Sequence, residues 1–81
     1  MKINVNLYYH LKEKAGASYI ELDVEESTTI SEVKTILEEK FPQLQTHLDN
    51  IMILMNQRIM LEEDSVVPDA NIAFLTPVGG G

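Results

Sequence analysis

Three consecutive glycines, Gly79 to Gly81, end the sequence, and the α-carboxylate of Gly81 is the group that we expect to do chemistry. Glycine has no Cβ and loses more backbone entropy on ordering than any other residue, so the stretch predicts an arm that leaves the fold. A thin arm can enter a narrow active site on another protein. The alternative is a frayed end or a cloning remnant, because chain ends are commonly disordered.

Side chains offer few candidates for catalysis. The sequence has no cysteine, which excludes a disulfide and a thiol nucleophile. His10 and His47 have no helix-spaced second ligand and no nucleophile motif, so we interpret them as surface histidines. The acidic run at residues 62–64 lacks the spaced oxygen ligands and the glycine of a calcium loop. We therefore expect no metal, no cofactor and no catalytic side chain.

The net charge of the chain indicates which class of partner it can bind. Thirteen acidic and six basic residues give a formal net charge of −7. Nucleic-acid binding needs a clustered basic surface, so we expect no nucleic-acid partner. The acidic excess instead favours steering towards a basic patch on a protein. Residues 2–7 alternate apolar and polar, unlike the apolar run of a signal peptide, and we expect a cytoplasmic protein without membrane association.

Two strands are predicted at the start of the chain. Residues 2–9 alternate, which predicts a half-buried strand with Tyr8 on its outer face. Residues 10–15 predict a helical turn closed by Gly16 in the left-handed conformation, and residues 18–24 alternate again and should pair with the first strand. The side chains that we expect to face the core from the first strand are Ile3, Val5, Leu7 and Tyr9.

One long helix is predicted to follow. Thr29 and Glu32 fit a capping box at its start, and Pro42 ends it by forcing the preceding residue out of the helical region. The polar stretch beyond, with isolated Leu44 and Leu48, is predicted to be a loop with at most a helical turn. The apolar stripe of the helix has helical spacing and consists of Ile30, Val33, Ile36, Leu37 and Phe41.

Three shorter strands complete the prediction. Residues 51–55 are a continuous apolar run, consistent with a strand buried on both faces. Residues 56–57 predict a tight turn, because asparagine tolerates positive φ, and residues 58–61 a short return strand. Residues 72–76 form the final strand, which delivers the tail. The methionines expected to fill the core are Met52, Met55 and Met60.

These elements predict an α+β fold in which one long helix packs across one face of a mixed sheet. We expect one domain over residues 1–76 and a flexible tail over residues 77–81, with the first and last strands side by side at the centre of the sheet. The second face of the sheet is then open. By alternation Tyr8, Ile59 and Leu75 project from it as an apolar patch near the root of the tail, whereas Phe74 faces the core.

The chain resembles the sulfur-carrier small subunits of molybdopterin synthase. The resemblance rests on the length, the order of elements, the Asn56-Gln57 turn and the ending Ile-Ala-Phe-Leu-Thr-Pro-Val-Gly-Gly-Gly. It spans essentially the whole chain, and its specific feature is the Gly80-Gly81 pair following Pro77-Val78. The family has the ubiquitin-like β-grasp fold, so the resemblance implies that fold here.

The resemblance also implies the chemistry. A carboxylate is a poor electrophile, so an ATP-dependent adenylating enzyme would activate Gly81, and a sulfur donor would displace AMP to leave a thiocarboxylate, which is a good nucleophile. Pro77 and Val78 would set the exit of the arm, and Gly79 and Gly80 would keep it thin enough for channels in two partners.

The partner implied for the finished thiocarboxylate is the large subunit of molybdopterin synthase. That subunit would supply the catalytic groups, and this chain would act as a co-substrate that donates sulfur for the dithiolene. The positions matching Tyr8, Ile59 and Leu75 carry apolar contacts with the large subunit in the family.

Three alternatives share the same ending. The chain could serve another sulfur pathway, such as thiamine synthesis, tRNA thiolation or a tungsten-type cofactor. It could be a ubiquitin-like modifier whose activated Gly81 joins a lysine of a target protein. It could also be a binding module with an inert tail. The sequence does not separate these functions.

Overall fold

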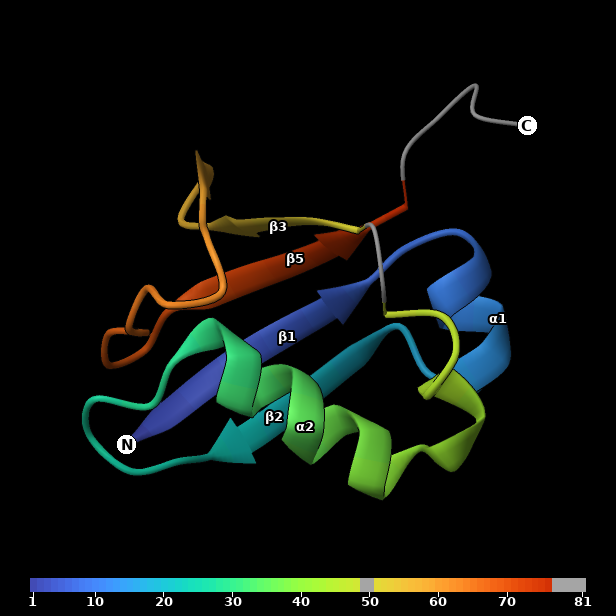
Figure 1. Ribbon diagram of the computed structural model, residues 1–81, viewed down its shortest axis with the longest axis horizontal. Helices are drawn as coiled ribbons and strands as arrows, with labels where there is room; N and C mark the ends of the chain where they lie inside the picture. The colour runs from blue at the N-terminus through green and yellow to red at the C-terminus, as the bar shows by residue number, and fades with distance from the viewer. Residues whose placement is uncertain (49–50, 77–81) are drawn as a thin grey trace.

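A single five-stranded sheet organises the part of the chain that the structure describes, residues 1–48 and 51–76 of a computed structural model (Figure 1). The elements along the chain are β1 (Lys2–Leu7), α1 (His10–Ala15), β2 (Tyr19–Asp23), α2 (Ile30–Lys40), the 3₁₀ helix η1 (Pro42–Leu44), β3 (Met52–Met55), β4 (Arg58–Ile59) and β5 (Asn71–Leu75).

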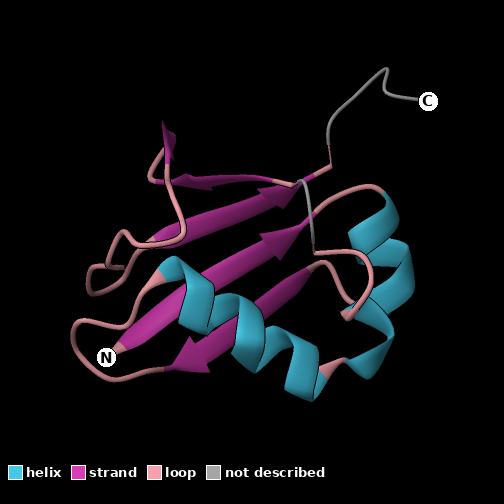
Figure 2. Ribbon diagram, viewed as in Figure 1, coloured by secondary structure: helices cyan, strands magenta, loops and turns pink. Residues whose placement is uncertain are grey.

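The strand order is β2-β1-β5-β3-β4, which confirms that the first and last strands are neighbours at the centre. β1 and β5 are parallel, whereas β1 with β2, β3 with β5 and β3 with β4 are antiparallel. The sheet is therefore mixed, as expected. Figure 2 shows the longer helix, α2, running across the β1–β2 side of this sheet.

The core lies between one face of the sheet and α2. Alternate residues of the central strands are buried there, and the apolar stripe of α2 packs against them, since Ile30, Val33 and Leu37 are all fully buried. Ile36 and Phe41 are partly buried against the same cluster. The core residues supplied by the two central strands are Ile3, Val5, Leu7, Ile72 and Phe74.

The start of α2 is fixed by its own capping box and by a distant loop. Thr29 and Glu32 form the predicted reciprocal box. The next two N–H groups also find acceptors, because Ile30 donates to the Asp64 carbonyl at 2.9 Å and Ser31 to the Glu62 carbonyl at 3.0 Å. The helix start is thereby joined to the loop that precedes β5.

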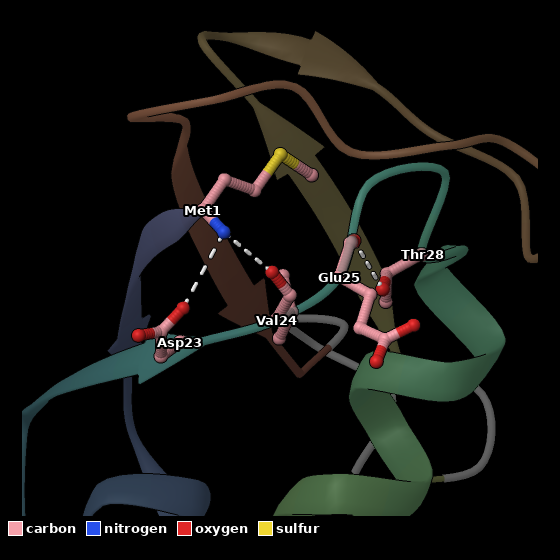
Figure 3. A network of polar contacts seen from close by, with 5 residues as sticks. All are labelled: Met1, Asp23, Val24, Glu25 and Thr28. Atoms are coloured by element: carbon pink, nitrogen blue, oxygen red, sulfur yellow. Dashed lines mark hydrogen bonds and ion pairs between the residues drawn. The ribbon is translucent and has the colours of Figure 1, made fainter.

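Polar contacts at the end of β2 join it to the chain start (Figure 3). The Met1 amine donates to the Val24 carbonyl at 2.6 Å and pairs with the Asp23 carboxylate at 3.3 Å, while the Thr28 hydroxyl donates to the Glu25 carbonyl at 2.6 Å. Together these contacts fix the path of the chain from β2 to α2.

Two turns adopt the backbone predicted from their residues. Gly16 closes α1 with φ 74°, a left-handed cap. Asn56 and Gln57 have φ of 51° and 71° between β3 and β4, which matches a two-residue hairpin turn with both central residues at positive φ.

Two expectations about burial are wrong, and two leucines of the predicted loop prove to be buried. Tyr9 does not face the core, because β1 ends at Leu7 and the chain reverses, leaving Tyr9 58% exposed. The run 51–55 is not buried on both faces, since Met52 is 44% exposed and Ile53 is buried, although Met55 and Met60 do pack against the core. Leu44 and Leu48 are fully buried and belong to the core although they lie outside regular strands and α-helices.

Within residues 1–48 and 51–76, no helix is long and apolar enough to cross a membrane. The tail residues Pro77, Val78, Gly79, Gly80 and Gly81, and with them the expected domain boundary after residue 76, lie outside the described residues.

Candidate functional site

The strand that leads to the tail is held firmly at the centre of the sheet. β5 pairs with β1 on one side and β3 on the other. Its core-facing residues Ile72 and Phe74 are fully buried, which confirms the expectation for Phe74. The Phe74 carbonyl also accepts from the Tyr8 N–H at 3.3 Å. The root of the tail is therefore a fixed point of the fold.

The opposite face of the sheet carries side chains in rows that follow the strand register, because paired residues on neighbouring strands point to the same side. The row at the tail root contains Leu75, its β3 partner Met52 and, beyond the end of β1, Tyr8. The next row crosses the whole sheet through the pairs Tyr19–Asn6, Asn6–Ala73, Ala73–Leu54 and Leu54–Ile59.

The three residues expected on this open face all lie on it. Tyr8 is 42% exposed and Leu75 half-buried, and both line one hollow. Ile59 lies further out, at the β4 edge, where it is 69% exposed and pairs with Leu54. Sequence reasoning missed Met52, Leu54 and Ala73, which complete the apolar surface between them. We call the six residues the docking patch: Tyr8, Met52, Leu54, Ile59, Ala73 and Leu75.

The hollow on this face has a volume of about 550 Å³. Its lining combines docking-patch residues with side-chain amides, and contains no charged side chain among the described residues. In a chain of net charge −7, this neutrality suits contact with an apolar protein surface, because burial there desolvates no charge. The lining consists of Asn6, Tyr8, Leu54, Asn56, Gln57, Asn71, Ile72, Ala73 and Leu75.

A row of hydrogen-bonded polar side chains borders the docking patch on the side away from the tail. The Tyr19 hydroxyl donates to the Asn4 side-chain oxygen at 2.6 Å, and the Asn4 amide donates to Asn71 at 3.4 Å. Asn56 continues the row, because its side-chain oxygen accepts from the Asn71 N–H at 3.0 Å. The apolar part of the open face is thus confined to the half nearest the tail.

The described residues do not assemble a metal site. In residues 1–48 and 51–76, no three His, Cys, Asp or Glu side chains gather as a metal ion requires. Two of the acidic residues 62–64 make contacts within the fold instead, since Glu62 pairs with Lys34 at 3.0 Å and the Asp64 carboxylate accepts from the Leu61 N–H at 2.7 Å.

Comparison with protein families matches residues 5–81 to a model described as the ThiS family. Comparison with curated protein sequences gives no match.

Solved structures share the fold of the whole chain. SAMP1 of Haloferax volcanii is 22% identical with a TM-score of 0.90, covering 100% of both chains. The putative molybdopterin converting factor subunit 1 of Pyrococcus furiosus is 14% identical with a TM-score of 0.87, covering 96% of this chain and 99% of that one. A chain from the complex of subunits 1 and 2 of the Helicobacter pylori molybdopterin-converting factor is 21% identical with a TM-score of 0.73, with full coverage of both. The fold is therefore the expected ubiquitin-like β-grasp.

Proposed function

The chain belongs to the ThiS family of ubiquitin-like sulfur carriers, and on that premise we propose that it is the small subunit of a molybdopterin synthase. The observation that carries the proposal is the family match, which continues through the terminal Gly80-Gly81. Two structurally similar chains are named as subunit 1 of a molybdopterin converting factor, and the one from H. pylori is in complex with a subunit 2. These names support the choice of pathway.

The reactive group in this proposal is the C-terminal carboxylate of Gly81. Its oxygen attacks the α-phosphorus of ATP in an adenylating enzyme, pyrophosphate leaves, and an acyl adenylate forms. A sulfur donor then delivers sulfide (HS⁻), which attacks the acyl carbon as AMP leaves, so that Gly81 ends as a thiocarboxylate. Within the large subunit the thiocarboxylate sulfur displaces an oxygen substituent from carbon of the pterin precursor and forms a thioester. Water then cleaves the acyl–sulfur bond, so that the sulfur stays on the pterin and Gly81 returns to a carboxylate. We propose a cytoplasmic location, because the adenylation consumes ATP.

The described part of the chain supports a carrier role through its division into a rigid root and a neutral docking patch. β5 fixes the point from which Pro77, Val78, Gly79, Gly80 and Gly81 continue. Leu75 belongs to the docking patch and is also the last residue of β5. A partner that covers the docking patch therefore contacts the chain within a few residues of the tail. Five residues reach at most about 17 Å when extended, which limits the distance between the docking patch and the partner's active site.

The tail is tested by changing only its end. Deleting Gly81, or adding one residue after it, should abolish sulfur transfer by the reconstituted synthase and leave the thermal unfolding midpoint at the wild-type value, because neither change touches the core. The matched control is Val67→Ala, a change at an exposed loop residue remote from the tail root. Full transfer activity in the deletion variant would contradict the proposal.

A second candidate function is a ubiquitin-like protein modifier. The similarity to SAMP1 of H. volcanii, a small archaeal modifier protein, favours it. In that function the activated Gly81 would be attacked by a lysine amine rather than by sulfur, forming an isopeptide bond with loss of AMP. Lysine-linked conjugates that form with the activating enzyme, in the absence of any thiocarboxylate, would support the modifier over the carrier.

A further inference from the structure

Tyr9 is an exposed aromatic residue in a backbone conformation that suits glycine. Its φ of 55° and ψ of −128° match the first central position of a type II′ turn. The turn is closed by the Leu11 N–H, which donates to the Tyr8 carbonyl at 3.1 Å. Glycine reaches this region without steric cost, whereas a residue with a Cβ is strained there. Stability alone would therefore favour glycine at position 9.

The surrounding structure enforces this conformation from both sides. The Tyr8 N–H donates to the Phe74 carbonyl of β5 at 3.3 Å, and the Tyr9 carbonyl accepts from the Glu13 N–H of α1 at 3.2 Å. The following residue on the core side, Leu11, is fully buried. Strain that is held by neighbouring elements in this way is a feature of functional positions.

The Tyr9 ring does not offset the backbone strain by packing into the core. It is 58% exposed, and its described aromatic neighbour is Tyr8, with ring centroids 6.4 Å apart and an interplanar angle of 48°. Tyr8 is itself part of the docking patch and lines the neutral hollow. The two rings therefore form one aromatic projection beside the root of the tail.

We propose that Tyr9 is a second aromatic anchor for the protein partner that covers the docking patch, and that its strained backbone aims the ring at that partner. This inference rests on the proposed function, because it names the same partner, the large subunit of the synthase. The recess that receives Tyr9 should be apolar with a neutral hydrogen-bond acceptor at its end, since a tyrosine buries its ring and keeps a partner for its hydroxyl. The uncharged lining of the adjoining hollow matches a partner surface of that chemistry.

The test compares Tyr9→Gly with Tyr9→Ala, because both remove the ring but only glycine relieves the backbone. Binding of the large subunit, measured by calorimetry, should weaken by about 30-fold or more in both variants, as for a tyrosine hot spot. The thermal unfolding midpoint should rise by about 4 °C in Tyr9→Gly and stay at or below the wild-type value in Tyr9→Ala. Val67→Ala serves as the control for loss of an exposed side chain elsewhere.

Wild-type affinity in both Tyr9 variants would overturn the inference, and so would a lowered midpoint in both, because the ring would then serve the fold. Different results would contradict the proposed synthase partner and the proposed role of Tyr9. If Tyr9→Gly binds normally and Tyr8→Asp binds weakly, Tyr9 is not part of the interface but the docking patch is. Absence of binding by the wild-type chain contradicts the proposed synthase partner and the role of Tyr9 with it.

Discussion

Replacing Tyr8 by aspartate should separate docking from folding. Tyr8 follows β1 and its ring lies on the open face, 42% exposed. The core on the other face, built around residues such as Phe74, should be unaffected. The variant should therefore unfold near the wild-type temperature but bind the large subunit poorly.

The size of the effect follows from the exposed area of the ring. Aromatic side chains bury about 150–250 Å² in full, so a Tyr8 that is 42% exposed leaves about 60–100 Å² for a partner to cover. At about 25 cal/mol per Å² this area contributes about 2 kcal/mol to binding, equivalent to about 30-fold in Kd. Aspartate also brings a charge into a neutral hollow, so the loss should be at least this large.

The assay is calorimetric titration of the large subunit with each variant. Val67→Asp is the matched control, because Val67 has the same 42% exposure as Tyr8. It precedes β5, whereas Tyr8 lies beside the last residues of that strand, so the two positions are at opposite ends of the sheet. Val67→Asp should bind like the wild type. A Kd for Tyr8→Asp within threefold of the wild-type value would refute a central role for the docking patch.

Two further predictions concern stability. Phe74→Ala should lower the free energy of unfolding in urea by about 3–5 kcal/mol, because it empties a fully buried site on the central strand; a loss below about 1 kcal/mol would mean that the core does not depend on this ring. Gln57→Gly should raise the free energy of unfolding by about 0.5 kcal/mol, because glycine adopts the φ of 71° without strain, partly offset by its greater entropy when unfolded. Destabilisation in the same assay would show that the Gln57 side chain contributes more than its backbone costs.

The sheet and the long helix could be predicted because their residues alternate or repeat in ways that one buried face requires. β1, β2 and β5 each bury every second residue, and the α2 stripe and capping box match their patterns. The central pairing of β1 with β5 follows from the strong core faces of both.

The misreading of β3 has a physical cause. Both faces of this strand are apolar, which is typical of a fully buried strand, but Met52 and Leu54 lie on the open face of the sheet, in the docking patch. An apolar open face therefore gave the same sequence pattern as a buried one. Leu75 on the next strand was interpreted correctly because alternation through Phe74 fixed its face.

Tyr9 and the hollow could not be derived from local pattern. Alternation extends a strand through Tyr9, and a tyrosine gives no signal for a turn that needs positive φ, so only the tertiary contacts reveal the reversal. The hollow depends on the register of non-adjacent segments, since Tyr8, Leu54 and Leu75 come from separate parts of the chain. Sequence reasoning found two of these three because they alternate with core residues.

The most direct test of the carrier function is the intact mass of the protein after co-expression with its adenylating enzyme and a sulfur donor. We expect the mass to rise by the difference between sulfur and oxygen, and fragmentation should assign the change to Gly81. A catalytically dead adenylating enzyme is the control and should leave the mass unchanged. An unmodified Gly81 in the presence of an active adenylating enzyme and donor would contradict the claim that this carboxylate carries sulfur.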